Sequence, residues 1–207
     1  FFLTAQQVKD FGIPKEFLKR AVGRTKDATE SILTLKDVEA LEKENRPTFL
    51  LSINGQESYP KSITDYLKVG EEMGLPSRSL IQQRKPWYKM EQRKVPPLLF
   101  AYLGRRNTRF IKNEAGVLPL TGFLCVYPIY DDQEYIDNLW TALNHPDTLE
   151  NLKLVGKSYG SGAIKVEPSN LNKLSIPEHI VAQFNLKRPY KNANGQFDFF
   201  REPKTRI

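Results

Sequence analysis

Apolar positions recur with helical spacing toward both ends of the chain. Leu35, Val38 and Leu41 lie three residues apart, a spacing typical of a helix with one buried face. Thr4 followed three residues later by Gln7 has the pattern of a helix-capping box, and Thr34 with Asp37 are candidates to cap a second helix. Patterns of this kind predict helices over residues 4–12, 34–46, 62–74, 77–84, 135–143, 148–154 and 178–184, with short helical turns over 13–20 and from 168.

The middle of the chain changes to β-branched and aromatic stretches separated by Gly and Asn. These stretches predict strands over 98–103, 109–111 and 123–127, with an earlier strand over 49–53 and a later one over 164–166. The expected fold class is therefore α+β, a mixed fold with central strands and helices at both ends. We expect one domain over 1–185, with 1–76 and 77–185 as candidate lobes, and a loosely ordered basic tail over 186–207.

Composition excludes several classes of protein. Among 207 residues, 40% are hydrophobic, which is enough to build a core. Cys125 is the single cysteine, so an intramolecular disulfide or a multi-cysteine metal site is excluded. No apolar run approaches membrane-spanning length. The chain begins at Phe1 without a Met or a signal peptide, so we expect it to be a piece of a longer protein.

The net charge of +7 is concentrated in two places. Residues 78–112 contain ten basic residues and the single acid Glu91, for a net +9, and the tail 186–207 carries +4, which leaves −6 for the rest. We call residues 78–112 the basic stripe. Clustered Lys and Arg indicate a polyanion partner, because they displace the counterions condensed on phosphates. The stripe also holds aromatic residues that could stack on bases. The alternative is that the cations solvate a surface while the aromatic side chains fill the core.

Motifs for independent catalysis are missing from the sequence. A nucleophile elbow, a paired His-Glu zinc motif and a phosphate-binding P-loop do not occur. Val95-Pro96-Pro97-Leu98 only superficially matches the Asn-Pro-Pro-Tyr motif of amino-methyltransferases, since the Asn and the aromatic residue are both replaced. We therefore expect no catalytic, cofactor-binding or metal-binding residues in this chain.

A glycine-rich segment over 156–162 offers a second binding candidate. Lys157, Ser158 and Tyr159 supply donors suited to phosphates and base edges, and the glycines permit a close backbone approach to a ligand. A tight connection between a helix and a strand explains the same residues equally well.

Several segments resemble a known family through their order and spacing. They are Phe1-Phe2-Leu3 with Gly12-Ile13-Pro14, Arg84-Lys85-Pro86-Trp87-Tyr88, Arg109-Phe110-Ile111-Lys112-Asn113, Trp140-Thr141-Ala142-Leu143-Asn144, and the run from Gly160 through Pro168 to Ile176-Pro177. Together they resemble the C-terminal target-recognition domain of gamma-type adenine-specific DNA methyltransferases from restriction–modification systems. The resemblance covers about residues 1 to 180.

The resemblance implies a module that binds double-stranded DNA and positions it for a catalytic domain absent from this chain. That missing domain would bind S-adenosylmethionine and take the flipped adenine, while this chain would hold no cofactor. It also implies a bacterial or archaeal cytoplasmic protein near the nucleoid, with no membrane partner. The expected DNA contacts are Arg78, Arg84, Lys85, Trp87, Tyr88, Lys89, Arg105, Arg106, Arg109, Lys157, Ser158 and Tyr159.

The aromatic residues Trp87 and Tyr88 are expected to support the basic face from below more than to touch bases. Two other functions fit the same charge pattern. One is a specificity module of a multi-subunit restriction system, and the other is an accessory domain that binds RNA or protein.

Overall fold

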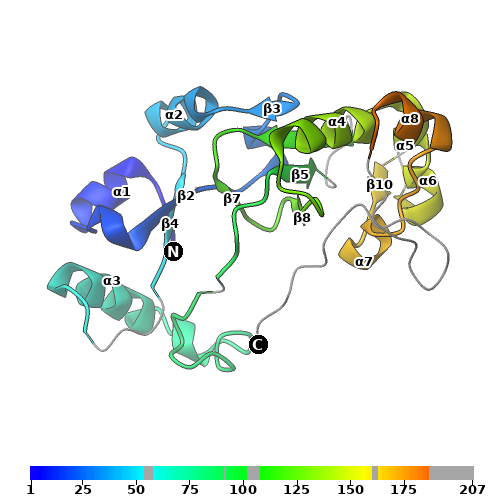
Figure 1. The fold of residues 1–207 in the computed structure, drawn as a ribbon. Helices are drawn as coiled ribbons and strands as arrows, with labels where there is room; N and C mark the ends of the chain where they lie inside the picture. Colours follow the sequence, from blue (N-terminus) through cyan, green and yellow to red (C-terminus); the bar gives the residue numbers. More distant parts are fainter. Residues whose placement is uncertain (54–57, 91, 102–107, 160–162, 187–207) are drawn as a thin grey trace.

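The computed structural model describes residues 1–53, 58–90, 92–101, 108–159 and 163–186. Helices and strands are mixed along the whole chain, in two four-stranded sheets and one two-stranded ribbon. The α+β class expected from the sequence is confirmed. Figure 1 shows α1, α2 and α3 at one end of the molecule, and the helices from α5 onward at the other end.

The first sheet joins strands from distant parts of the sequence. Its order is β1 (Phe2–Leu3), β4 (Phe49–Leu51), β2 (Leu18–Val22) and β7 (Leu118–Pro119). The β2–β7 pair is parallel and the other pairs are antiparallel. Because side chains alternate between the two faces of a strand, Leu3 and Leu51 enter one core cluster while Leu50 and Ala21 enter another.

The second sheet forms the centre of the molecule. Its order is β3 (Ile32–Leu33), β6 (Arg109–Asn113), β5 (Leu98–Ala101) and β8 (Leu124–Val126), with β3 parallel to β6. Phe100 and Phe110 are fully buried on one face, with ring centroids 4.7 Å apart. The predicted strands over 98–103 and 109–111 are confirmed where the structure describes them.

Helices α1 (Ala5–Asp10) and α2 (Leu35–Lys43) begin at the predicted capping boxes, in which Thr4 and Thr34 are the capping residues. Helix α3 (Lys61–Glu72) buries Ile63 and Leu67 against the first sheet. It ends before Gly74, whose φ of +66° lies in the left-handed region that favours glycine.

The C-terminal part is mostly helical. It consists of α4 (Gln133–Leu143), α5 (Pro146–Glu150), α6 (Leu152–Val155), β9 (Lys157–Tyr159), β10 (Ala163–Lys165), α7 (Pro168–Leu171) and α8 (Glu178–Gln183). Buried side chains from α4, α6, α7 and α8 share one cluster with β5 and β6. Among the described residues, no helix is both long enough and apolar enough to span a bilayer.

Three local predictions are wrong in whole or in part. The expected helix over 77–84 is a short 3-10 helix at Leu75–Ser77 followed by turns. The helical turn expected over 13–20 is confirmed only as a 3-10 helix at Lys15–Phe17, because residues 18–20 already belong to β2, whose pairing with β4 and β7 buries Ala21 and Val22. The first half of the expected loop over 156–162 contains β9, which pairs with β10. Strands therefore also occur near the N-terminus, in addition to the central ones.

Candidate nucleic-acid interface

Four of the predicted contact residues lie together on the segment that leads from α3 toward β5. Arg78, Arg84, Lys85 and Lys89 are all exposed. Within the described part of the chain, none of them forms an ion pair. Arg84, Lys85 and Lys89 line an open recess of about 420 Å³ with Gln83 and Met90. We call residues 78–90 the basic segment. Its positive charge is available to a partner.

Aromatic contacts hold the basic segment against α3. The Trp87 ring stacks on Phe1 at a centroid distance of 5.7 Å, and its indole N–H donates to Oε1 of Glu71 at 3.3 Å. A Cβ on Gly70 would lie only 2.6 Å from Trp87 Cη2. The ring can therefore pack against α3 at this position only because residue 70 has no side chain. These contacts fix Trp87, which lies between Lys85 and Lys89 in the sequence, against Phe1 and α3.

Tyr88 belongs to the same aromatic group. Its ring meets Tyr59 edge-on at a centroid distance of 6.0 Å and Trp87 at 5.8 Å. Edge-to-face pairs of this kind add stability beyond the area that they bury. Both aromatic residues of the predicted site are therefore half-buried and packed against the N-terminal core cluster.

Other cations of the basic stripe are engaged with protein groups. Lys112 Nζ lies 2.7 Å from Asp137 and 3.0 Å from Glu114, with 15% of its side chain exposed. The hydrogen bond with Asp137 raises the pKa of Lys112, and burial opposes this shift. Lys94 Nζ lies 3.7 Å from Asp131. The stripe's charge is thus partly neutralised within the fold.

Arg109 also faces protein groups. Its guanidinium donates to the backbone carbonyls of Ala28 and of Glu30, the latter at 3.4 Å. Burial lowers the pKa of Arg109, and the charge of Glu30 opposes this shift. The Arg109 side chain therefore joins the second sheet to residues 28–30 through hydrogen bonds.

The remaining predicted contacts do not join the basic segment. Arg105 and Arg106 lie outside the described residues. Lys157, Ser158 and Tyr159 form β9, which pairs with β10, and Figure 1 shows β10 at the opposite end of the molecule from the segment that follows α3. The predicted site is therefore divided between two places.

Sequence reasoning missed the role of Asn144, although the residue belongs to a segment that carries the family resemblance. Its amide accepts from the backbone N–H of Phe110 at 3.0 Å and donates to the carbonyl of Phe110 at 2.9 Å. It also donates to the carbonyl of Trp140 at 3.0 Å. The side chain acts as a substitute strand partner at the edge of β6, and it joins the end of α4 to the sheet.

Asn113 has a similar structural role. It is 7% exposed, and its amide donates to the carbonyls of Pro96 at 2.8 Å and Val117 at 2.9 Å. Its side-chain oxygen accepts from the Val117 N–H at 3.2 Å. The available signal was an Asn two residues beyond a predicted strand, because a buried amide must find partners.

The described residues contain no group of three or more His, Cys, Asp and Glu side chains placed to hold a metal ion. The fold and the basic segment together define an α+β domain that presents unpaired cations on a rigid aromatic support. Proteins of this class are candidates for binding a polyanion.

Comparison with known proteins identifies the family. The family model described as "Type II methyltransferase M.Eco57I, C-terminal domain" matches residues 1–196, so the chain belongs to this family of methyltransferase C-terminal domains. The chain is 34% identical over 175 residues to the Type II methyltransferase M.AccI of Acinetobacter calcoaceticus, covering 84% of this chain and 32% of that protein. It is 25% identical over 169 residues to the Type II methyltransferase M.XamI of Xanthomonas campestris pv. amaranthicola, covering 80% of this chain and 31% of that protein.

The chain thus spans about a third of the length of these two relatives. No solved structure matches it. The resemblance to a methyltransferase C-terminal domain that the sequence predicted is confirmed.

Proposed function

We propose that this chain is the target-recognition domain of an adenine-specific DNA methyltransferase. It binds double-stranded DNA and positions it for a catalytic domain in another part of the protein. That catalytic domain binds S-adenosylmethionine and methylates the flipped adenine. Membership of the methyltransferase C-terminal family supports this proposal.

The observation that carries the proposal is the exposed cation group on the basic segment. Arg84, Lys85 and Lys89 surround one recess and have no ion-pair partner among the described residues. Unpaired cations can neutralise phosphates without first breaking an internal pair. The stacking of Trp87 on Phe1 holds the backbone of the segment, so less loop ordering is needed on binding.

We propose different roles for the stripe's cations. Those on the basic segment contact DNA phosphates, whereas Arg109 and Lys112 act within the protein, as their contacts with Ala28, Glu30, Glu114 and Asp137 support. Arg105 and Arg106, which precede β6, belong to the proposed interface on the strength of their charge alone. Lys157, Ser158 and Tyr159 on β9 form a separate proposed contact.

A charge-reversal experiment tests the proposal. The variant carries Arg84→Glu, Lys85→Glu and Lys89→Glu, and its affinity for a fluorescent DNA duplex is measured at several salt concentrations. We expect near-complete loss of binding, because each lost phosphate contact reduces the slope of log K against log salt by about 0.9. The matched control carries Lys9→Glu, Lys36→Glu and Lys43→Glu on α1 and α2, which are exposed lysines elsewhere.

Two results would contradict the proposal. The first is duplex affinity of the triple variant equal to that of the unmodified chain. The second is tighter binding of structured RNA than of duplex DNA by the unmodified chain. A methyl-transfer assay on the 207-residue chain alone should give no product, and adenine methylation in that assay would show that catalysis resides here.

A further inference from the structure

A second recess lies beside the first sheet. None of the residues that line it was predicted from the sequence as a DNA contact. Its volume is about 250 Å³, and its walls include Phe2, Arg24, Asp27, Arg46 and Thr121. Arg46 pairs with Asp27, so these two charges offset each other. Arg24 is exposed and forms no ion pair within the described part of the chain. The recess therefore carries one uncompensated positive charge.

Two glycines allow the close packing at and beside this recess. A Cβ on Gly23 would lie 2.7 Å from the Phe2 ring, so the ring can rest on the backbone only beside glycine. A Cβ on Gly122 would lie 2.9 Å from the Gly23 carbonyl oxygen and 3.4 Å from Arg24 Cα. The turn that bears Arg24 is thus packed directly against the turn at residues 121–122. This packing holds the Arg24 backbone in place before any ligand binds.

One small buried cluster connects the two recesses through residues that pack on it. Ala21, Leu50 and Leu118 form a small buried cluster on one face of the first sheet. Met90, which lines the first recess, packs on this cluster, as does Phe2, which lines the second. Each recess is therefore lined by a residue that packs on the same buried cluster, Met90 in the first and Phe2 in the second.

Lys19 adds a further cation to this face. It pairs with Leu50 in the sheet, and Leu50 pairs with Phe2. Residues directly opposite one another in a sheet point to the same side, so Lys19 lies on the face that carries Phe2 and Leu50 of that cluster. Lys19 is exposed and has no ion-pair partner among the described residues. Its neighbour Arg20 points to the other face, where it pairs with Glu42 at 3.3 Å.

We propose that Arg24 and Lys19 form a second phosphate-binding point, so that one DNA duplex contacts both the basic segment and this face of the first sheet. The ligand is the phosphodiester backbone and not a base. A guanidinium fork matches the oxygens of a phosphate and can bind two of them at once. This inference rests on the proposed function, because it extends the same duplex-binding face to residues outside the basic stripe.

The test uses the 207-residue chain with Lys19→Gln and Arg24→Gln combined. The probes are two fluorescent duplexes of unrelated sequence, each titrated at several salt concentrations. We expect weaker binding by the same factor for both duplexes, because phosphate contacts carry no sequence information. The slope of log K against log salt should fall by about 1.8, for two lost contacts. Arg24→Lys should keep the charge and most of the slope.

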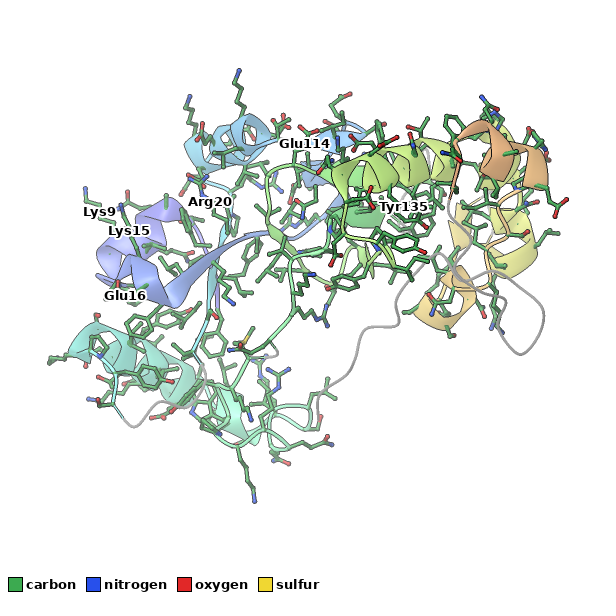
Figure 2. All side chains as sticks on the ribbon, in the orientation of Figure 1. Lys9, Lys15, Glu16, Arg20, Glu114 and Tyr135 are labelled. Atoms are coloured by element: carbon green, nitrogen blue, oxygen red, sulfur yellow. The ribbon has the colours of Figure 1, made fainter. Side chains whose placement is uncertain are left out.

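The control variant combines Lys9→Gln and Arg20→Gln. It removes the same number and type of cations, but Lys9 lies on α1 and Arg20 on the opposite face of β2. Figure 2 shows Arg20 near α2 and Lys9 at the outer side of α1. We expect the control to keep the duplex affinity and the salt slope. Thermal unfolding of both variants checks that each is folded.

Three results would overturn the inference. One is unchanged duplex affinity and salt slope in the Lys19/Arg24 variant. Another is weakening for one duplex only, which would indicate base reading. The third is saturable binding of inorganic phosphate that depends on Arg24 while duplex binding does not, which would indicate a free-anion site. In each case, loss of binding in the Arg84/Lys85/Lys89 variant would leave the proposed function standing, whereas retained binding there would refute the proposed function itself.

Discussion

Replacing Asn144 by alanine should destabilise the second sheet without touching the proposed DNA face. The side chain makes three hydrogen bonds of 2.9–3.0 Å to the backbone of Phe110 and Trp140. After Asn144→Ala the Phe110 carbonyl still accepts from the Trp140 indole N–H at 3.0 Å. The Phe110 N–H loses its side-chain partner beneath α4.

The expected loss follows from these contacts. A net hydrogen bond contributes about 1 kcal/mol, and a buried donor left unsatisfied costs about 1–3 kcal/mol. We therefore expect the free energy of unfolding to fall by about 2–4 kcal/mol, out of about 5–15 kcal/mol for a typical domain.

Urea denaturation followed by circular dichroism measures this loss, and an unchanged m-value indicates a change in stability alone. Asn144→Asp keeps the shape but replaces the donor with a carboxylate that faces two carbonyls. We expect it to be at least as destabilising as alanine at neutral pH. The control is Asn172→Ala, at an exposed asparagine after α7, with an effect within about 0.5 kcal/mol. A loss for Asn144→Ala no larger than that of the control would refute the reasoning.

Three further changes test other parts of the structure. Lys112→Gln should lower stability but leave the salt slope of duplex binding unchanged, because Lys112 is paired with Asp137; a changed slope would place Lys112 at the interface. Gly122→Ala should cost about 1–3 kcal/mol through overpacking against the neighbouring turn, and an unchanged melting temperature would contradict this packing. The hydrogen bond from Lys165 lowers the pKa of Glu167. The pair therefore stabilises the fold above the ordinary carboxyl pKa, and its contribution is lost as pH falls through the lowered value. Lys165→Gln should raise the pKa of Glu167 in a carboxyl NMR titration, and no change would exclude the pairing.

The helices and strands near the N-terminus show which elements local sequence patterns can predict. The capping boxes at Thr4 and Thr34 correctly predicted where α1 and α2 begin, because the bonds of a capping box join residues only three apart. The helix expected over 77–84 was wrong: residues 78–84 form turns in which Leu80 is 80% exposed, and Pro86 follows closely. The strand at residues 18–22 was missed because its partners, β4 and β7, lie about 30 and 100 residues further along the chain.

Some features of the candidate site could likewise be predicted from the sequence, and others depended on the fold. The positive charge of residues 78–112 is a property of the sequence, and it was visible without any structure. Which cations remain unpaired depended on Asp137 and on the carbonyl of Ala28, neither of which is near its partner in sequence. Arg24 carried no sequence signal at all, because its recess forms only where residues 2, 46 and 121 meet.

The sequence by itself determined the family, the mixed fold class, the capped helices and the total charge of the basic stripe. The fold class, the helix caps and the charge depend on composition or on residues close together along the chain, and the family depends on the order and spacing of short segments. Only the tertiary structure decided which of the described cations lack an ion-pair partner and that Lys19 shares one face of the first sheet with Phe2. The physical reason is that a charge is neutralised by whatever the fold brings within a few ångströms of it, and those neighbours come from strands and helices far apart in the sequence.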